Sequence, residues 1–191
     1  MIEQALSVRE AIVQRRSIKL FNRQPVDRDD LMEILNEAAW APNHKNREPW
    51  RFVVAVGEGL TKWQEVIKDF NMSKWKDLSP QALETQMKKL LGPGAVVFVI
   101  VPEDIRQKER LEDYAAASAF IQNAQLLAWD RGIGSCWKTP AYIEDPKIRE
   151  VLGVQPGERI ISMLQFGYFD VVPKGRERTP IEEKTTFFGE E

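Results

Sequence analysis

The chain has 191 residues, of which 43% are apolar and 29% are charged, and its formal net charge is −2. This composition is typical of a single globular domain and excludes a largely disordered chain. The small net charge provides no overall attraction to nucleic acid or to an anionic membrane, so any site for an anion must be local.

The chain contains one cysteine, Cys136, and one histidine, His44. A single cysteine excludes an intrachain disulfide and fits a reducing compartment, and a zinc site built from several Cys and His ligands is excluded as well. The first residues lack the basic-then-apolar layout of a signal peptide, and no apolar run approaches the roughly 20 residues that span a bilayer. We therefore expect a cytoplasmic protein without a membrane segment.

The first predicted helix leads into a basic cluster. Residues 7–10 form the capping box S-x-x-E, so a helix should begin at Ser7, with an apolar stripe of Val8, Ala11 and Ile12. The stretch 15–21 follows and reads Arg-Arg-Ser-Ile-Lys-Leu-Phe. Guanidinium groups, a hydroxyl and an ammonium this close together can bind a phosphate. The alternative is a solvated helix end, where cations complement the helix dipole.

Apolar periodicity and turn residues predict the other elements. Helices are expected over residues 27–40, 60–70, 79–90, 107–131 and 145–153, and strands over residues 50–56, 95–101 and 159–166. Together they predict one α+β domain, residues 1–191, arranged as a sandwich whose sheet order the sequence does not specify.

Two segments are expected to lie outside this regular framework. Residues 71–79 are mostly polar and are predicted to be a mobile excursion that helps to cover a pocket. Residues 171–191 hold prolines and a glycine among many charges. We expect this tail to be an arm that packs on a partner subunit.

Four sequence blocks resemble the FMN-dependent nitroreductase family. Residues 15–21 resemble its R-R/H-S-x-R/K-x-F motif, 41–50 resemble A-P-S-x-x-N-x-Q-P-W, 132–137 resemble G-L-G-S-C-W, and 166–176 resemble the closing G-Y-x-x-x-x-x-K-x-R. The blocks occur in the family's order and span most of the chain. The resemblance implies an α/β/α sandwich with a mostly antiparallel sheet, assembled as an intertwined homodimer with FMN at the subunit interface.

The second block departs from the family pattern at two points. The run Asn43-His44-Lys45 replaces the commoner serine-rich version and indicates a subgroup with an A-P-x-H-K loop. Glu48 stands where glutamine is usual. Because a carboxylate beside the flavin would disfavour the reduced, anionic cofactor, we expect Glu48 to point away from the flavin or to pair with a cation such as Arg51.

The resemblance also implies roles for individual residues. Lys19 would be the catalytic residue, acting electrostatically beside flavin N1 and O2, with no acid or base assigned. One subunit would make the phosphate and ribityl contacts, and the 42–46 loop would come from the other subunit. Residues 137–139 would lie at the N5 edge of the flavin. The implied cofactor-binding residues are Arg15, Arg16, Ser17, Lys19, Pro42, Asn43, His44, Asn46, Trp137, Lys138, Thr139, Lys174 and Arg176. Cys136 is expected to be a small buried side chain.

The implied function is an NAD(P)H nitroreductase-type oxidoreductase. NADH or NADPH would reduce FMN through N5, and a nitroaromatic or quinone acceptor would then take the electrons in a ping-pong reaction. Two alternatives stay open, a flavoprotein of the same fold with a specialised non-nitro substrate and a non-catalytic protein that binds flavin or another phosphate ligand. The physiological acceptor and the preferred nicotinamide are not specified by the sequence.

Overall fold

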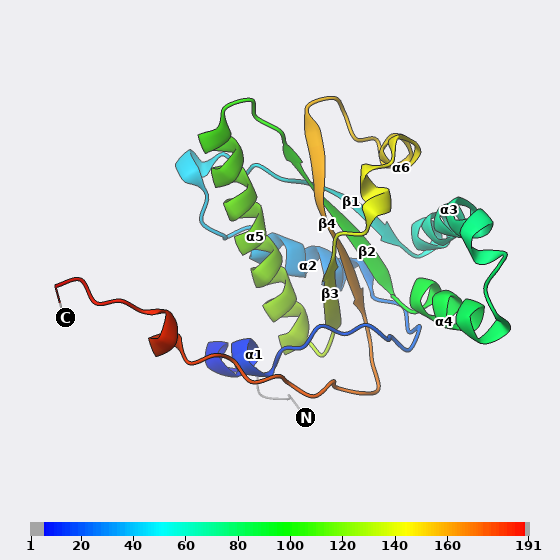
Figure 1. Ribbon diagram of the computed structural model, residues 1–191, viewed down its shortest axis with the longest axis horizontal. Helices are drawn as coiled ribbons and strands as arrows, with labels where there is room; N and C mark the ends of the chain where they lie inside the picture. The colour runs from blue at the N-terminus through cyan, green and yellow to red at the C-terminus, as the bar shows by residue number, and fades with distance from the viewer. Residues whose placement is uncertain (1–5, 190–191) are drawn as a thin grey trace.

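A four-stranded antiparallel sheet with the order β1-β2-β4-β3 forms the centre of the computed structural model, which describes residues 6–189 (Figure 1). The strands are β1 (Arg51–Val56), β2 (Ala95–Pro102), β3 (Gly134–Lys138) and β4 (Glu158–Gly167). The helices are α1 (Val8–Gln14), α2 (Arg28–Ala38), α3 (Glu58–Trp75), α4 (Pro80–Leu91), α5 (Gln107–Asp130) and α6 (Pro146–Val151), and short 3-10 turns cover His44–Asn46, Ala141–Glu144 and Ile181–Lys184. The predicted α+β sandwich is confirmed, and the structure supplies its sheet order.

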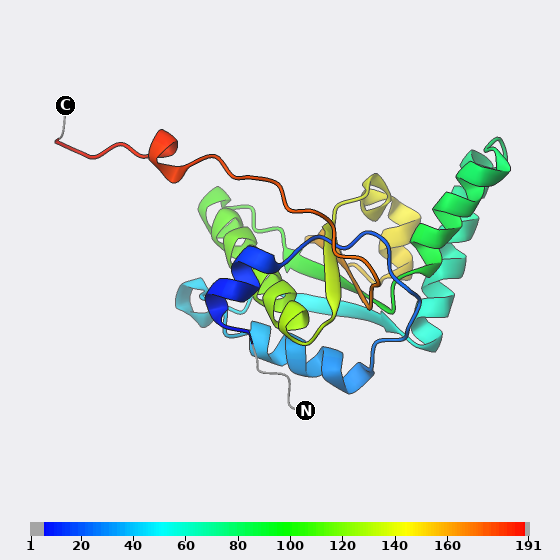
Figure 2. The same cartoon turned by 90° about the horizontal axis from the view of Figure 1, so that it is seen from below.

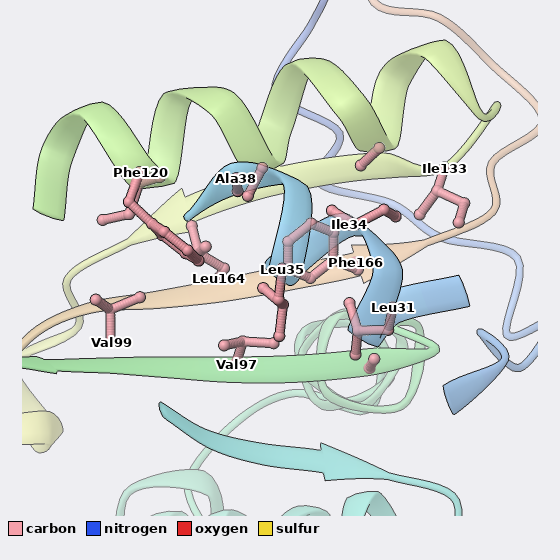
Figure 3. Close-up of a cluster of buried hydrophobic side chains, with 14 of the residues drawn as sticks. Leu31, Ile34, Leu35, Ala38, Val97, Val99, Phe120, Ile133, Leu164 and Phe166 are labelled. Carbon is pink, nitrogen blue, oxygen red and sulfur yellow. The ribbon is translucent and has the colours of Figure 1, made fainter. Parts of the chain in front are cut away.

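Two hydrophobic cores hold the helices on opposite faces of the sheet. On one face, Leu31 and Ile34 of α2 and Phe120 of α5 pack with Val97 of β2 and Phe166 of β4 (Figure 3). Each of these side chains is fully buried. Burying a side chain of this size contributes about 1.5–3 kcal/mol, so this layer is a main source of the fold's stability.

The opposite face of the sheet is covered by α3 and α6. Trp63 and Ile67 of α3 and Ile148 of α6 pack with Phe98 and Ile160 of the sheet. Strand β2 is buried from Ala95 to Val101, because helices cover both of its faces. The continuous apolar run in the sequence predicted this two-sided burial.

The segment after α1 runs beside β3, at the edge of the sheet. The backbone N–H of Ile18 donates to the Ser135 carbonyl at 3.0 Å, and Ser17 and Ser135 form a parallel bridge. Gly134 makes this approach feasible, since an added Cβ would lie 2.6 Å from Cγ1 of Ile18. The basic cluster is therefore fixed to a strand and does not continue a helix.

One local expectation was wrong, and two features go beyond what was expected. Residues 71–75 belong to α3, because the helical spacing of apolar residues continues to Trp75 and the Asn71 side chain donates to the Ile67 carbonyl at 2.8 Å. The capping box at Ser7 is confirmed, but Val8 and Ile12 are exposed and only Ala11 of the expected stripe is buried. Residues 134–138 form the strand β3, where no strand was predicted.

The chain beyond β4 first runs beside the segment after α1 and then leaves the body of the subunit. Its only regular element among the described residues up to 189 is the short turn Ile181–Lys184 (Figure 2). Figures 1 and 2 both show this tail projecting away from the sheet and helices. Ile181, Phe187 and Phe188 are exposed along it. Among residues 6–189, no helix is both long enough and apolar enough to cross a membrane.

Candidate anion-binding site

A groove of about 1150 Å³ lies between the segment after α1 and the beginning of the C-terminal tail. These two stretches run side by side in both ribbon views (Figures 1 and 2). The groove is lined by Ile12, Val13, Arg15, Arg16, Ser17, Ile18, Lys19, Leu20, Phe21, Asp170, Val171, Pro173, Lys174, Gly175, Arg176 and Arg178. Six of these side chains are basic and one is acidic, so the site favours an anion although the whole chain carries a net charge of −2.

Arg15 is a half-buried cation of the groove. Its Nη1 atom is buried and has no hydrogen-bond partner among the described residues 6–189. Burial, followed by the nearby charges of Arg16 and Arg178, lowers the pKa of the Arg15 guanidinium. A buried donor without a partner costs free energy, and an anionic acceptor in the groove would remove that cost.

Arg16 points its guanidinium at the end of α1. Its Nη1 donates to the carbonyls of Val13, Gln14 and Arg15 at 2.7, 2.9 and 2.8 Å. Here the alternative suggested by the sequence, a cation that complements a helix end, describes the observed contacts. The Nε atom is buried and has no hydrogen-bond partner among residues 6–189.

The tail contributes the other wall. Lys174 and Arg176 line the groove as the closing motif predicted, and both are exposed. Gly175 between them lies against Arg16, where an added Cβ would come within 2.9 Å of Cζ. Sequence analysis missed Arg178, which also lines the groove and acts electrostatically on Arg15. The third basic residue in the run from Lys174 to Arg178 was the available signal.

Lys19 lies where the groove approaches β3. The charges of Lys138 and Lys19 act against the effect of burial on the pKa of the Cys136 thiol. Cys136 is 3% exposed, and its burial raises the pKa of the thiol, in agreement with the expected small buried side chain. Burial also lowers the pKa of Lys138, with the charges of Lys89 and Lys19 adding to the effect.

Trp137 and Thr139 lie in a second pocket, of about 430 Å³. They share it with Tyr114 and Arg159, whose guanidinium donates to Glu144 at 3.0 and 3.1 Å. The hydroxyl oxygen of Tyr114 is buried and has no hydrogen-bond partner within residues 6–189. Of the three predicted residues 137–139, Trp137 and Thr139 therefore line this pocket and Lys138 does not.

The loop with Pro42, Asn43, His44 and Asn46 lies far from the groove within the same subunit. Arg47 anchors this loop to α5, with its Nη2 3.1 Å from Oδ2 of Asp113. Near the other end of α5, Asp130 accepts a hydrogen bond of 2.6 Å from the backbone of Leu6, just before α1. At 1.5 Å per helical residue, these anchors are about 25 Å apart. One subunit alone therefore does not bring the two halves of the predicted site together.

The same loop holds an unusual backbone. Lys45, Asn46 and Glu48 have φ values of 53°, 55° and 46°, a left-handed conformation that is unfavourable for Lys and Glu. Asn43 supports it by accepting the backbone N–H of Glu48 at 2.9 Å. Strain of this kind persists only where surrounding contacts enforce it, and it is frequent at binding sites.

The suggested pairing of Glu48 with Arg51 is wrong. Arg51 instead donates to both carboxylate oxygens of Glu158, through Nε at 2.6 Å and through Nη2. The Arg51 hydrogen bonds lower the pKa of the Glu158 carboxyl. Glu158 lies on β4 beyond the neighbouring strand, a contact that residue spacing alone does not indicate.

Known proteins of one family resemble this chain in sequence and in fold. A family model described as the nitroreductase family matches residues 12–168. The "Putative NAD(P)H nitroreductase YfhC" of Bacillus subtilis is 36% identical over 188 residues, covering 97% of this chain and 96% of the relative. The crystal structure of a nitroreductase-like family protein from Bacillus cereus superposes with a TM-score of 0.87 and 39% identity over 100% of both chains. The FMN and NADPH-dependent nitroreductase NfnB from sphigopyxis sp. strain HMH has the same fold, with a TM-score of 0.73, 21% identity and coverage of 96% and 100%.

Proposed function

The chain belongs to the nitroreductase family, and from this premise we propose that it is an FMN-dependent oxidoreductase that uses NADH or NADPH to reduce nitroaromatic or quinone-type acceptors. The observation that supports the proposal most directly is the basic groove between residues 15–21 and 170–178. Its charge, its buried unpartnered donors and its position in the fold suit a cofactor with a phosphate at one end.

The residues of the groove fit FMN. The phosphate is a dianion, and Arg15, Lys174, Arg176 and Arg178 offer cationic donors around one space. Charge-assisted hydrogen bonds are roughly twice as strong as neutral ones, so these four residues would provide most of the phosphate affinity. Gly175 keeps the tail close to Arg16, which helps to shape the phosphate end. Ser17 would add a hydroxyl.

Lys19 would act at the ring end of the cofactor. When bound, FMN supplies hydride acceptance from NAD(P)H at N5 and the return of two electrons to an acceptor that follows on the same face. Lys19 would hold a positive charge near N1 and O2, where negative charge accumulates on reduction. Its backbone is fixed because the segment from Ser17 lies against β3. Solvent can supply the protons, so no side-chain acid is assigned.

We infer that the working enzyme is a homodimer. The loop with Pro42, Asn43, His44 and Asn46 would then reach the cofactor from the second subunit, since in its own subunit it is anchored to the opposite end of α5 from Leu6 and the start of α1, about 25 Å along the helix at 1.5 Å per residue. The exposed apolar residues of α1 and the tail beyond residue 171 support this assembly. The tail would be the arm that packs on the partner.

Three measurements test the proposal. Size-exclusion chromatography with light scattering should give a dimer, and the apoprotein should bind one FMN per subunit. Anaerobic stopped-flow should show reduction of the bound flavin by NADH or NADPH, followed by reoxidation on mixing with a nitroaromatic or a quinone. A flavin that neither nicotinamide reduces would refute the oxidoreductase assignment. Reduction without reoxidation by any member of the acceptor panel would instead favour a specialised non-nitro substrate.

A further inference from the structure

One side chain makes the polar contacts that tie the loop of residues 42–48 to distant parts of the subunit. Among the described residues 6–189, the hydrogen bonds and ion pairs that join this loop to residues outside 41–50 are all made by Arg47. Three residues of the loop have φ values between 46° and 55°. A left-handed backbone of this kind persists only where contacts enforce it, so the contacts of Arg47 help to determine the shape of the loop.

Arg47 joins the loop to two carboxylates. Its Nη2 lies 3.1 Å from Oδ2 of Asp113 and 3.6 Å from Oδ2 of Asp104. Asp113 is 2% exposed, and Arg47 is its only ion-pair partner among the described residues 6–189. Burial raises the pKa of the Asp113 carboxyl, and the charge of Arg47 opposes that effect. A buried carboxylate is unfavourable without a cation, so the pair favours the loop conformation that places Arg47 against α5.

A second arginine holds Asp104 in place. The Nε and Nη2 atoms of Arg106 donate to Oδ1 and Oδ2 of Asp104 at 3.1 and 2.8 Å, and Nη1 lies 3.1 Å from Glu109 in the first turn of α5. A two-pronged contact of this kind fixes the orientation of the carboxylate as well as its position. Arg47 therefore attaches the loop to a fixed unit, formed by the end of β2 and the beginning of α5.

We propose that the Arg47–Asp113 pair is a positioning device for flavin binding, which holds the 42–46 loop in the conformation that meets FMN in the partner subunit. The inference rests on the proposed function, because it takes FMN as the ligand and the second subunit as the source of the loop. Arg47 touches no cofactor and acts through the loop. Without it, the loop would adopt other conformations, and only the fraction in the binding conformation would bind flavin.

The first test is flavin binding by the Arg47→Met apoprotein, measured by fluorescence titration. Affinity should fall by a factor on the order of ten, the population shift expected when one left-handed residue relaxes. The loss should be the same for FMN and for riboflavin, because the loop would meet the ring and the ribityl chain. Arg15→Met should differ in this respect, since its loss should be confined to FMN.

A double variant separates positioning from stability. Arg47→Met leaves Asp113 without its cation, so the melting temperature of the apoprotein should fall by an amount on the order of 5 °C. Combining Arg47→Met with Asp113→Leu removes both charges, and apolar side chains of similar size can replace a buried pair without loss of stability. The melting temperature should then return toward the wild-type value while the affinity for flavin stays low. A purely structural role predicts that affinity recovers together with stability.

Arg131→Met is the matched control. The Arg131 side chain is 28% exposed, close to the 31% of Arg47, and it also forms two ion pairs, with Glu33 and Glu37. These contacts lie at the other end of α5 and hold α2. Arg131→Met should therefore lower the melting temperature and leave the affinity for FMN and riboflavin unchanged.

Mixed dimers test whether the pair acts across the subunit interface. A dimer of one Arg15→Met subunit and one Arg47→Met subunit would have one site with Arg15 and an intact partner loop, and one site that lacks both. Prepared by co-expression with two affinity tags, it should bind one FMN with wild-type affinity. Neither parent homodimer should have such a site. If the loop served its own subunit, the mixed dimer would have none either.

Specific outcomes would overturn the inference. These are unchanged flavin affinity in Arg47→Met, a loss confined to FMN, recovery of affinity in the double variant, or an equal loss of affinity in Arg131→Met. A mixed dimer without a wild-type site would also overturn it. Failure of the wild-type protein to bind FMN is a different result, since it would refute the proposed function itself.

Discussion

Replacing Arg15 with Met should weaken FMN binding and leave riboflavin binding almost unchanged. Arg15 is half-buried in the groove, and its Nη1 is a donor without a partner among residues 6–189. A hydrogen bond to a charged group is worth about 1.5–3 kcal/mol, which corresponds to roughly 10- to 150-fold in the dissociation constant. Because riboflavin has no phosphate, the loss should appear only with FMN.

The neighbouring arginine provides a matched control. Arg16 uses its Nη1 to bind three carbonyls at the end of α1. Arg16→Met should therefore lower the free energy of unfolding by about 1 kcal/mol and change the dissociation constant of FMN less than Arg15→Met does. Fluorescence titration of the apoproteins with FMN and with riboflavin, together with urea unfolding curves, measures both effects.

The comparison can refute the reasoning in two ways. If Arg15→Met weakens FMN and riboflavin equally, Arg15 supports the shape of the groove and does not bind the phosphate. If Arg16→Met has the larger effect on FMN and none on stability, the roles derived from the two guanidinium environments are reversed.

Three further predictions concern single substitutions. Lys19→Met should slow reduction of the flavin by NAD(P)H more than it weakens FMN binding, and stopped-flow traces with a larger effect on binding would contradict its electrostatic role. Glu158→Gln should cost about 1 kcal/mol at pH 7, because the partly exposed Arg51 pair holds the pKa of that carboxyl below its usual value. That contribution is present above the unfolded pKa of about 4.3 and is lost as pH falls through the folded value, so urea unfolding should show the difference fading below about pH 4. Glu84→Gln on the surface of α4 should cost less at pH 7. Gly134→Ala should lower the melting temperature and reduce the free energy of unfolding by about 1–3 kcal/mol, because the new Cβ would lie 2.6 Å from side-chain carbons of Ile18 and Phe169. An unchanged melting temperature would show that the segment beside β3 moves aside easily.

The sequence predicted those parts of the fold that local physics determines. The capping box at Ser7, the cap at Asp27 and the proline after Ser79 begin helices as their local chemistry requires. The run Ala95–Val101 became a strand covered on both faces. Each of these signals lies within a few residues of the element that it specifies.

The remaining features depend on contacts between distant segments. Residues 134–138 form a strand because β4 and the segment from Ser17 pair with them. Arg51 meets Glu158 because β1 and β4 lie on either side of β2, an order that local patterns do not contain. The stripe on α1 stays exposed in this subunit, since only Ala11 is buried.

The candidate site shows the same division. The basic cluster at residues 15–19 was visible in the sequence, and the fold brings it beside Lys174 and Arg176. The different uses of Arg15 and Arg16 follow from how α1 ends, which the sequence does not show. The environment of Lys138 likewise becomes visible only when β3 and the segment with Lys19 lie side by side.

The most direct test of the central claim is the absorption spectrum of the FMN-reconstituted protein under anaerobic conditions, before and after the addition of NADH and, separately, of NADPH. We predict a bound-flavin spectrum that bleaches with at least one nicotinamide and returns when a quinone or a nitroaromatic is added. A protein that takes up no FMN, or a bound flavin that neither nicotinamide bleaches, would contradict the account.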